Sequence, residues 1–336
     1  MRLPKFEHLQ PASREEVCRL LQEHGSMARL VAGGTDLYPR MKYGLARPDM
    51  LISLKGLSTT PPTVDPNGDL HVDALMTLSD LARSQTVLEK APLLSEAALS
   101  VASNQIRHMG TLGGNLCQET RCSYYNQTHT FQFVEPCFKR NGDQCYLIPK
   151  GKKCWAVFPS DTAPALISLR ASASVSGPKE RRELPLENLY TGDPLKPLAI
   201  SDGEVLTEII VPGSLSLRGT AFVKFTLRGG MEYAAFSIAV VLDMENDGIL
   251  CRAARITVGS VGAGPKRAGK GENAMAGQRL SKKLFQEVAK LVVTETHPFP
   301  HHGYSAAYLR ACLEVETRRA FGLAAEQITR NPGDPN

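Results

Sequence analysis

Cysteine is the residue type that is distributed most unevenly along this chain. Five of its eight cysteines fall between residues 117 and 154, and the other three are scattered. In a chain without a secretion signal, such crowding indicates metal binding or redox chemistry more often than disulfides. Four thiolates can hold a [4Fe–4S] cluster or a tetrahedral zinc ion. Because the spacing contains no C-x-x-C pair, it leaves a cluster, a zinc site and free thiols equally open.

Two glycine turns are the second feature that could do chemistry. Gly33-Gly34-Thr35-Asp36 follows a short apolar run, and Gly113-Gly114-Asn115 follows a threonine and a leucine. Glycine pairs let backbone N–H groups approach an anion closely, because no Cβ blocks it and φ is free to become positive. One such pair is usually an ordinary turn, but two pairs suit the two phosphates of a dinucleotide. Neither matches G-x-G-x-x-G or G-x-x-x-x-G-K-[ST], so a Rossmann or P-loop site is disfavoured.

Regular elements must position these turns. Ser13 and Glu16 form a capping box for a helix that ends at Gly25, and strands expected at 29–32 and 50–54 place the first glycine turn at a strand's carboxyl end. Further helices are expected beside Thr77 and at 92–103, 281–295 and 304–320, and further strands at 171–175, 221–227, 234–242 and 254–261. The expected subdomains are 1–57, 58–217 with a cysteine-rich insertion at about 117–155, and 218–327, followed by a tail over 328–336.

The composition is that of a globular chain. Its 336 residues are 42% hydrophobic and 22% charged, which suffices for two or three domains with buried cores. No apolar run approaches the roughly 18 to 20 residues of a membrane span. The N-terminus lacks the apolar stretch of a secretory signal, so we expect a cytoplasmic protein. The net charge of +5 is spread along the chain and is too small to indicate nucleic-acid binding.

Both glycine turns, with their flanking residues 31–37 and 111–116, resemble the flavoprotein subunits of the xanthine dehydrogenase and carbon monoxide dehydrogenase family. Residues 160–164, S-D-T-A-P, and Lys224 resemble later segments of the same family. The resemblance implies an α+β chain with a vanillyl-alcohol-oxidase (PCMH)-type FAD-binding domain of two subdomains. A C-terminal α+β domain of the carbon monoxide dehydrogenase flavoprotein type would follow. One departure is Glu232-Tyr233, where the family often has Asp-Phe.

The same resemblance implies which residues would bind FAD. The two glycine turns would wrap the pyrophosphate and ribityl chain through backbone donors. Asp161 would lie near the adenosine, and Lys224 near the flavin ring, where a cation stabilises the negative charge of reduced flavin. Without the resemblance, Asp161 would be interpreted as a turn cap and Lys224 as a solvated charge. The expected cofactor-binding residues are Val31, Ala32, Gly33, Gly34, Thr35, Asp36, Leu37, Thr111, Leu112, Gly113, Gly114, Asn115, Asp161 and Lys224.

The cysteine-rich insertion resembles a narrower group. Residues 115–127, N-L-C-Q-E-T-R-C-S-Y-Y-N-Q, look like the start of an insertion in the β subunits of 4-hydroxybenzoyl-CoA reductases. This resemblance implies a [4Fe–4S] cluster, with Cys117 left over as a packed or FAD-adjacent thiol. The implied ligands are Cys122, Cys137, Cys145 and Cys154.

Basic residues outnumber acidic ones in the insertion. A basic rim could steer an acidic electron carrier such as ferredoxin toward the cluster, although a merely solvated loop explains the charge equally well. The basic residues are Lys139, Arg140, Lys150, Lys152 and Lys153.

Together these features imply an electron-transfer subunit of a molybdenum-dependent oxidoreductase, without catalytic residues of its own. Electrons would pass between the [4Fe–4S] cluster, FAD and the [2Fe–2S] clusters of a small partner subunit. A large subunit would carry the molybdenum cofactor, in a dimer of heterotrimers. The implied enzyme is 4-hydroxybenzoyl-CoA reductase or a close relative.

Three alternatives remain open. One is the FAD subunit of an oxidative molybdenum hydroxylase that acts on another aromatic or N-heterocyclic substrate. Another is a zinc-stabilised interaction protein without flavin. The third, a free-standing flavin oxidase, is weakened because no histidine or cysteine can be assigned as a covalent flavin anchor.

Overall fold

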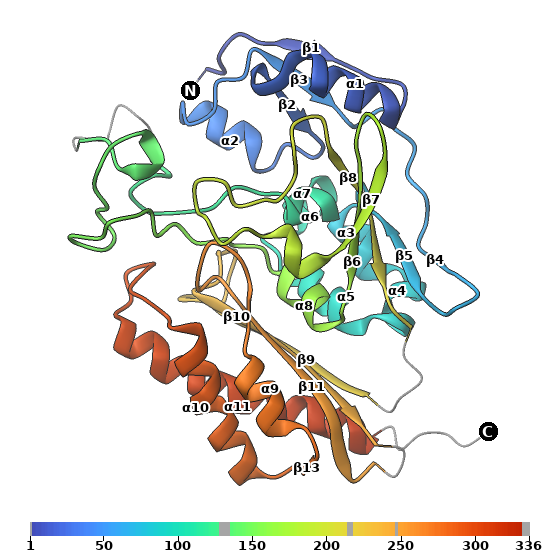
Figure 1. The fold of residues 1–336 in the computed structure, drawn as a ribbon, viewed down its shortest axis with the longest axis vertical. Helices are drawn as coiled ribbons and strands as arrows, with labels where there is room; N and C mark the ends of the chain where they lie inside the picture. Colours follow the sequence, from blue (N-terminus) through green and yellow to red (C-terminus); the bar gives the residue numbers. More distant parts are fainter. Residues whose placement is uncertain (1, 128–134, 214–217, 246–247, 331–336) are drawn as a thin grey trace.

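Three β-sheets form the framework of the chain in the computed structural model, which describes residues 2–127, 135–213, 218–245 and 248–330 (Figure 1). The first sheet is parallel, in the order β1 (Glu7–Leu9), β3 (Met50–Ser53), β2 (Ala28–Val31). Helix α1 (Arg14–His24) begins where the Ser13 side chain accepts a hydrogen bond from the Glu16 N–H, and it packs Val17 against this sheet. The helix and both strands predicted here are confirmed to within about one residue.

The second sheet is antiparallel and lies at the centre of the molecule (Figure 1). Its order is β4 (Thr63–Val64), β5 (Leu70–Asp73), β8 (Val205–Val211), β6 (Ser172–Ser176), β7 (Arg181–Pro185). The accompanying helices are α3 (Leu78–Arg83), α4 (Gln85–Lys90), α5 (Pro92–Leu99), α6 (Asn104–Met109), α7 (Leu112–Leu116) and α8 (Thr162–Ser168). The helix predicted over 92–103 ends earlier, at Leu99: Ala102 adopts a φ of 44°, and Ser103 caps the separate helix α6.

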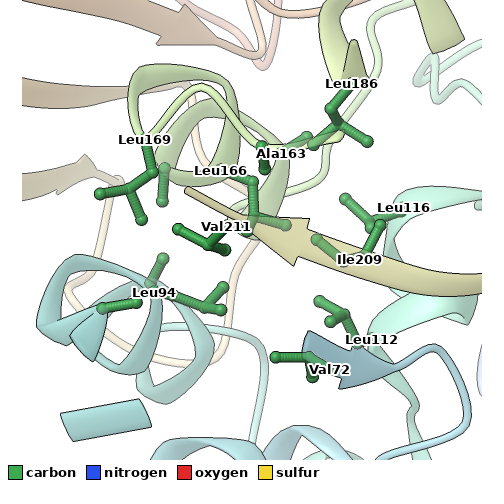
Figure 2. Close-up of a cluster of buried hydrophobic side chains, with 14 of the residues drawn as sticks. Val72, Leu94, Leu112, Leu116, Ala163, Leu166, Leu169, Leu186, Ile209 and Val211 are labelled. Atoms are coloured by element: carbon green, nitrogen blue, oxygen red, sulfur yellow. The ribbon is translucent and has the colours of Figure 1, made fainter. Parts of the chain in front are cut away.

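The core of this second unit holds α7 in place. Figure 2 shows side chains from α5, α7, α8 and β8 converging, among them Leu94, Leu112, Leu166 and Ile209. All four are fully buried. A buried leucine contributes about 1.5 to 3 kcal/mol relative to an exposed one, so this contact fixes a helix of only five residues.

The C-terminal unit is an antiparallel sheet covered by helices. Its order is β12 (Lys266–Arg267), β11 (Leu250–Gly259), β10 (Phe236–Met244), β9 (Arg218–Phe225), and β13 (Gln278–Arg279) also pairs with β11. Helices α9 (Gly269–Met275) and α11 (Ala306–Arg330) pack on it, and α10 (Lys282–Thr296) packs against these two helices (Figure 1). Along β10, Ile238 and Val240 belong to this core while Ala239 and Val241 belong to the core of the second unit. Strand β10 is therefore shared between the two units.

The boundaries of the expected subdomains stay a prediction, although the strands of the three sheets fall within the three expected ranges. Helix α11 runs to Arg330, past the expected domain end at 327, so the tail does not begin at 328. Residues 331–336 of that tail lie outside the described residues. The described residues of the expected cysteine-rich insertion, 117–127 and 135–155, form a loop that projects to one side of the molecule, shown in green in Figure 1, and residues 128–134 lie outside the described residues. No helix in the described ranges is long and apolar enough to cross a membrane.

Candidate cofactor site

A cleft of about 730 Å³ lies where the first subdomain meets the other two. Both glycine turns line it, and so does every expected cofactor-binding residue except Leu112. Residues 198 and 200–206 and residues 231–233 also line it and were not predicted. The Ser201-Asp202-Gly203 run is a turn signal that could have indicated the first of these segments. The Glu232-Tyr233 departure was the only sign of the second.

The first glycine turn touches the chain that leads into the second. A Cβ on Gly33 would lie 1.7 Å from the Met109 carbonyl oxygen, so only glycine permits this approach. Gly34 has a φ of 69°, a conformation that favours glycine. Among the described residues, no acceptor takes the N–H groups of Gly33, Gly34 or Thr35. Three neighbouring backbone donors are therefore available to an anionic ligand in the cleft.

The second glycine turn is held by its leucines and its threonine. Thr111 Oγ1 accepts a hydrogen bond of 3.0 Å from the Gly114 N–H. Leu112 and Leu116 point into the core one helical turn apart, so Gly113, Gly114 and Asn115 face the cleft. Contrary to expectation, Leu112 does not line the cleft, because its side chain is fully buried and its N–H donates to the Met76 carbonyl.

Asn115 is oriented by two hydroxyl groups. Its Oδ1 accepts hydrogen bonds from Ser160 Oγ at 2.6 Å and Thr162 Oγ1 at 2.7 Å. Within the described residues its amide NH2 group donates no hydrogen bond to a side chain or carbonyl. Since Asn115 lines the cleft, this amide is placed to donate to a bound ligand.

Asp161 and Lys224 form a buried ion pair, with Lys224 Nζ 2.7 Å from Asp161 Oδ2. Lys224 Nζ also donates to the Ser100 carbonyl at 2.8 Å, whereas Asp161 Oδ1 is buried without a partner. Burial raises the pKa of Asp161 to about 6, although Lys224 acts to lower it. The ion pair places both expected residues side by side in one part of the cleft, and the assignment of Asp161 to the adenosine and Lys224 to the flavin ring stays a prediction.

The cysteine-rich loop is closed by two backbone bridges. Arg121 and Val157 exchange antiparallel hydrogen bonds of 2.7 and 2.9 Å, which brings the chain next to Cys122 close to the chain that follows Cys154. A second bridge pairs Cys137 with Gln144, so Cys137 also lies near Cys145. The two bridges therefore bring all four cysteines into one part of the loop. We call these four residues the insertion cysteines.

The insertion cysteines influence one another. Burial raises the pKa of Cys122, and the nearby thiols of Cys154 and Cys145 raise it by a smaller amount. Burial likewise raises the pKa of Cys154, and the thiols of Cys137 and Cys145 raise it by a smaller amount. Even so, in the described part of the chain no three His, Cys, Asp or Glu side chains are placed to hold a metal ion. The loop thus gathers the thiols without arranging them as ligands.

Cys117 stands apart from the insertion cysteines. It lines the cleft, and burial raises its pKa to about 12. Its ionisable neighbour is Tyr190. Burial and the Cys117 thiol both raise the pKa of Tyr190. Cys117 is therefore a packed, protonated thiol at the wall of the cleft.

A row of charged side chains joins the cleft to the loop. Asp36 contacts Arg121 and lies 3.7 Å from Arg40, whose other nitrogen lies 3.3 Å from Glu119. Lys139 Nζ lies 2.9 Å from Glu119 on the other side. Although burial acts to raise it, these two cations hold the pKa of Glu119 below its usual value.

Lys139 does not belong to the expected basic rim, because its side chain is only 5% exposed and is paired with Glu119. Arg140 is half-buried. The other three basic residues of the insertion are exposed. We call Lys150, Lys152 and Lys153 the lysine rim.

Two family models cover nearly the whole chain. Residues 4–214 match the FAD binding domain in molybdopterin dehydrogenase, and residues 221–324 match the CO dehydrogenase flavoprotein C-terminal domain. The chain belongs to the family of FAD-binding, or medium, subunits of the xanthine dehydrogenase and carbon monoxide dehydrogenase enzymes.

Individual relatives agree with this assignment. The carbon monoxide dehydrogenase medium chain of Afipia carboxidovorans is 29% identical over 320 residues, covering 95% of this chain and 96% of the relative. The FAD-binding subunit of an Escherichia coli aldehyde oxidoreductase is 30% identical over 255 residues, 71% of this chain and 76% of the relative. Among solved structures, the cyanide-inactivated Cu,Mo-CO dehydrogenase matches with a TM-score of 0.80 and 27% identity, over 97% of this chain and 100% of that one. The predicted fold class is confirmed.

The chain is accordingly the FAD subunit of a molybdenum hydroxylase-type oxidoreductase. Its relatives are medium or FAD-binding subunits of multi-subunit enzymes. The cleft fits FAD, since it offers backbone N–H donors for phosphates, a free amide and an unpaired carboxylate oxygen. When bound, FAD exchanges one or two electrons.

Proposed function

We propose that this chain carries electrons between a [4Fe–4S] cluster in its cysteine-rich loop, FAD in its cleft and [2Fe–2S] clusters of a partner subunit. The large partner would hold the molybdenum cofactor, in a dimer of heterotrimers related to 4-hydroxybenzoyl-CoA reductase. The observation that carries this proposal is the convergence of four thiols in a loop that begins at the flavin cleft. FAD suits the middle position because it links single-electron clusters to a two-electron centre.

Different residues of the cleft would bind different parts of FAD. The N–H groups of residues 33–35 would bind the pyrophosphate, and the Asn115 amide would donate to an oxygen of the ligand. Asp161 Oδ1 has no partner in the protein and would accept a hydrogen bond from a hydroxyl or N–H of the ligand. Lys224, 10% exposed, would keep Asp161 ionised and add a positive charge to this part of the cleft.

The residue types of the loop are those that an iron–sulfur cluster needs. Thiolates are the usual ligands of such clusters, and backbone N–H groups that donate to sulfur tune their potentials. Among the described residues, the Ile148 nitrogen lies 3.5 Å from Cys145 Sγ and the Ala156 nitrogen lies 3.5 Å from Cys154 Sγ. The insertion cysteines would be the four ligands, and Cys117 would not take part.

The lysine rim supports an acidic partner for the loop. Its three exposed lysines follow one another closely just before Cys154. Such a patch attracts an anionic carrier at a distance and loses its effect as salt screens the charges. A small acidic electron carrier such as ferredoxin would therefore dock at the loop and reduce the cluster.

Metal and flavin analysis of the purified complex tests the proposal. We expect one FAD and about four iron atoms per copy of this chain beyond those of the small subunit. Serine at the insertion cysteines should remove that iron, whereas Cys312→Ser, on helix α11, should not. A complex with FAD, zinc and no extra iron would contradict the cluster and favour a structural zinc site.

The relatives favour a second candidate, an enzyme that oxidises an N-heterocyclic substrate. Two are named 6-hydroxypseudooxynicotine dehydrogenase complex subunit alpha and caffeine dehydrogenase subunit beta. The two candidates differ in the direction of electron flow. Reduced viologen should drive removal of the hydroxyl group from 4-hydroxybenzoyl-CoA in the first case. In the second, an N-heterocyclic substrate should reduce an oxidised acceptor.

A further inference from the structure

Two buried hydroxyl groups, those of Ser160 and Thr162, surround the end of the Asn115 side chain. Both residues are 0% exposed and lie at the start of helix α8. Their oxygens lie 2.6 and 2.7 Å from Asn115 Oδ1. The backbone of Asn115 is held as well, because its N–H donates to the Thr111 carbonyl and its carbonyl accepts from the Gln118 side chain. Asn115 is therefore fixed at both ends.

The hydrogen bonds of Ser160 favour one orientation of the Asn115 amide. Ser160 Oγ accepts a hydrogen bond of 3.1 Å from the Ala163 N–H, and its own hydrogen goes to Asn115 Oδ1. Turning the amide over would point its NH2 group at both hydroxyls and remove the acceptor that their two hydrogens share. The contact between the two hydroxyl oxygens is 3.5 Å long and can take only one of these hydrogens. Because a buried donor without an acceptor is costly, the network keeps the NH2 group toward the cleft.

Neither hydroxyl belongs to the cleft itself. Asn115 lines the cleft, whereas Ser160 and Thr162 do not. Asp161, which lies between them in the sequence, also lines the cleft, but its carboxylate is held by Lys224 and by neither hydroxyl. An effect of the two hydroxyls on a ligand therefore acts through the amide of Asn115.

We infer that Ser160 and Thr162 are positioning residues for the cofactor. Together they hold the Asn115 amide as a hydrogen-bond donor, so this point of the cleft selects a ligand that presents an acceptor atom. This inference rests on the proposed contact between Asn115 and FAD. Without the hydroxyls, the amide presents either its NH2 group or its oxygen to the cleft, and the contact weakens.

FAD dissociation constants test this inference, measured by flavin fluorescence on the purified complex after its FAD has been removed. Thr162→Val keeps the shape of the side chain and removes the hydroxyl. It should weaken FAD binding about threefold to tenfold, the usual range for one hydrogen bond. Thr162→Ser keeps the hydroxyl and should bind FAD as the wild type does. Ser160→Ala should weaken binding in the same way as Thr162→Val, and it takes the place of that variant if the valine chain fails to fold.

Ser168→Ala is the matched control. Ser168 lies on the same helix and is 1% exposed. Its hydroxyl oxygen lies 3.1 Å from the Ala239 carbonyl oxygen and 2.8 Å from Thr257 Oγ1, and it does not line the cleft. The variant loses a buried hydroxyl from α8 as Thr162→Val does, but it should bind FAD with wild-type affinity.

A double-mutant cycle shows whether the effect runs through Asn115. Asn115→Leu has a similar volume and no amide, so it should itself weaken FAD binding. In the Asn115→Leu background, Thr162→Val should change the FAD dissociation constant by less than about twofold, because no amide remains to be oriented. A merely structural role of Thr162 would weaken binding equally in both backgrounds.

The outcomes separate this inference from the proposed function. Wild-type affinity of Asn115→Leu refutes the proposed contact between Asn115 and FAD, and the inference falls with it. If Asn115→Leu weakens binding, three results overturn the positioning role alone: wild-type affinity of Thr162→Val, equal weakening by Thr162→Ser or Ser168→Ala, and equal losses in both backgrounds of the cycle. A loss in Thr162→Val that Thr162→Ser restores and that vanishes in the Asn115→Leu background supports it.

Discussion

Replacing Lys224 with methionine tests the ion pair buried in the cleft. Lys224 and Asp161 are 10% and 5% exposed, and 2.7 Å separates their charged atoms. Removing one partner of such a pair costs about 3 to 5 kcal/mol, because the other charge stays buried and unpaired. At pH 8 we therefore expect Lys224→Met to lower the free energy of unfolding by about that amount and to release FAD at lower urea.

The size of this loss should depend on pH. Burial raises the pKa of Asp161 from 3.8 to about 6 in the native state. As the pH falls, the native state therefore binds this proton at a higher pH than the unfolded chain does. Asp161 consequently favours folding increasingly as the pH falls from about 6 toward 4. That difference corresponds to about 3 kcal/mol over the window. Without Lys224, which opposes the shift, the pKa rises further, so the variant takes up the proton at higher pH and its deficit shrinks by pH 5.

Urea titrations at pH 5 and pH 8, followed by flavin fluorescence, measure this effect. The wild type is compared with Lys224→Met and with a double variant that adds Asp161→Asn. The double variant has neither buried charge, so it should recover much of the stability lost at pH 8. The reasoning is refuted if Lys224→Met loses the same free energy at both pH values, or if the double variant is no more stable than the single one at pH 8.

Three further predictions concern the turn, the loop and its rim. Gly33→Ala should lose FAD, because the new Cβ would lie 1.7 Å from the Met109 carbonyl oxygen. The control Gly269→Ala should keep FAD, because no atom lies within 4 Å of its new Cβ. The flavin content of the purified chains measures this, and a yellow Gly33→Ala chain would contradict the packing argument. Serine at any insertion cysteine should reduce iron by up to about four atoms per chain in a colorimetric assay, and unchanged iron would exclude that residue as a ligand. Glutamate at all three positions of the lysine rim should slow reduction by an acidic carrier at low salt but not at high salt, as stopped-flow mixing would show. Lys283→Glu, on helix α10, is its control, and equal slowing by both variants would count against a docking surface.

Local signals in the sequence predicted the elements that local interactions hold together. The Ser13 cap, the glycine turns and the apolar run of β10 are visible as residue types in order, and the structure contains each of them. The cofactor residues expected from the family resemblance nearly all line one cleft in the structure. Leu112 is the exception, because a segment match does not say which side of a short helix faces the core.

Contacts between distant residues could not be predicted in the same way. Strand β8 pairs with β5, more than a hundred residues earlier, and no signal in either segment specifies the partner. The Asp161–Lys224 and Arg121–Asp36 pairs likewise join different units. On α11, residue type alone does not indicate the buried face, because Tyr308 and Val315 are 48% and 50% exposed. The buried stripe instead contains Leu309, Leu313, Ala320 and Phe321.

The bridge between Arg121 and Val157 also bears on how independently the cysteine-rich loop and the cleft can change. Because the chain leaves the scaffold and rejoins it at one point, the described residues between these two positions form an excursion. The segments that line the cleft lie outside that excursion, before residue 121 and after residue 157. An insertion or deletion at this point would therefore add or remove the cysteine-bearing module without changing any residue that lines the cleft.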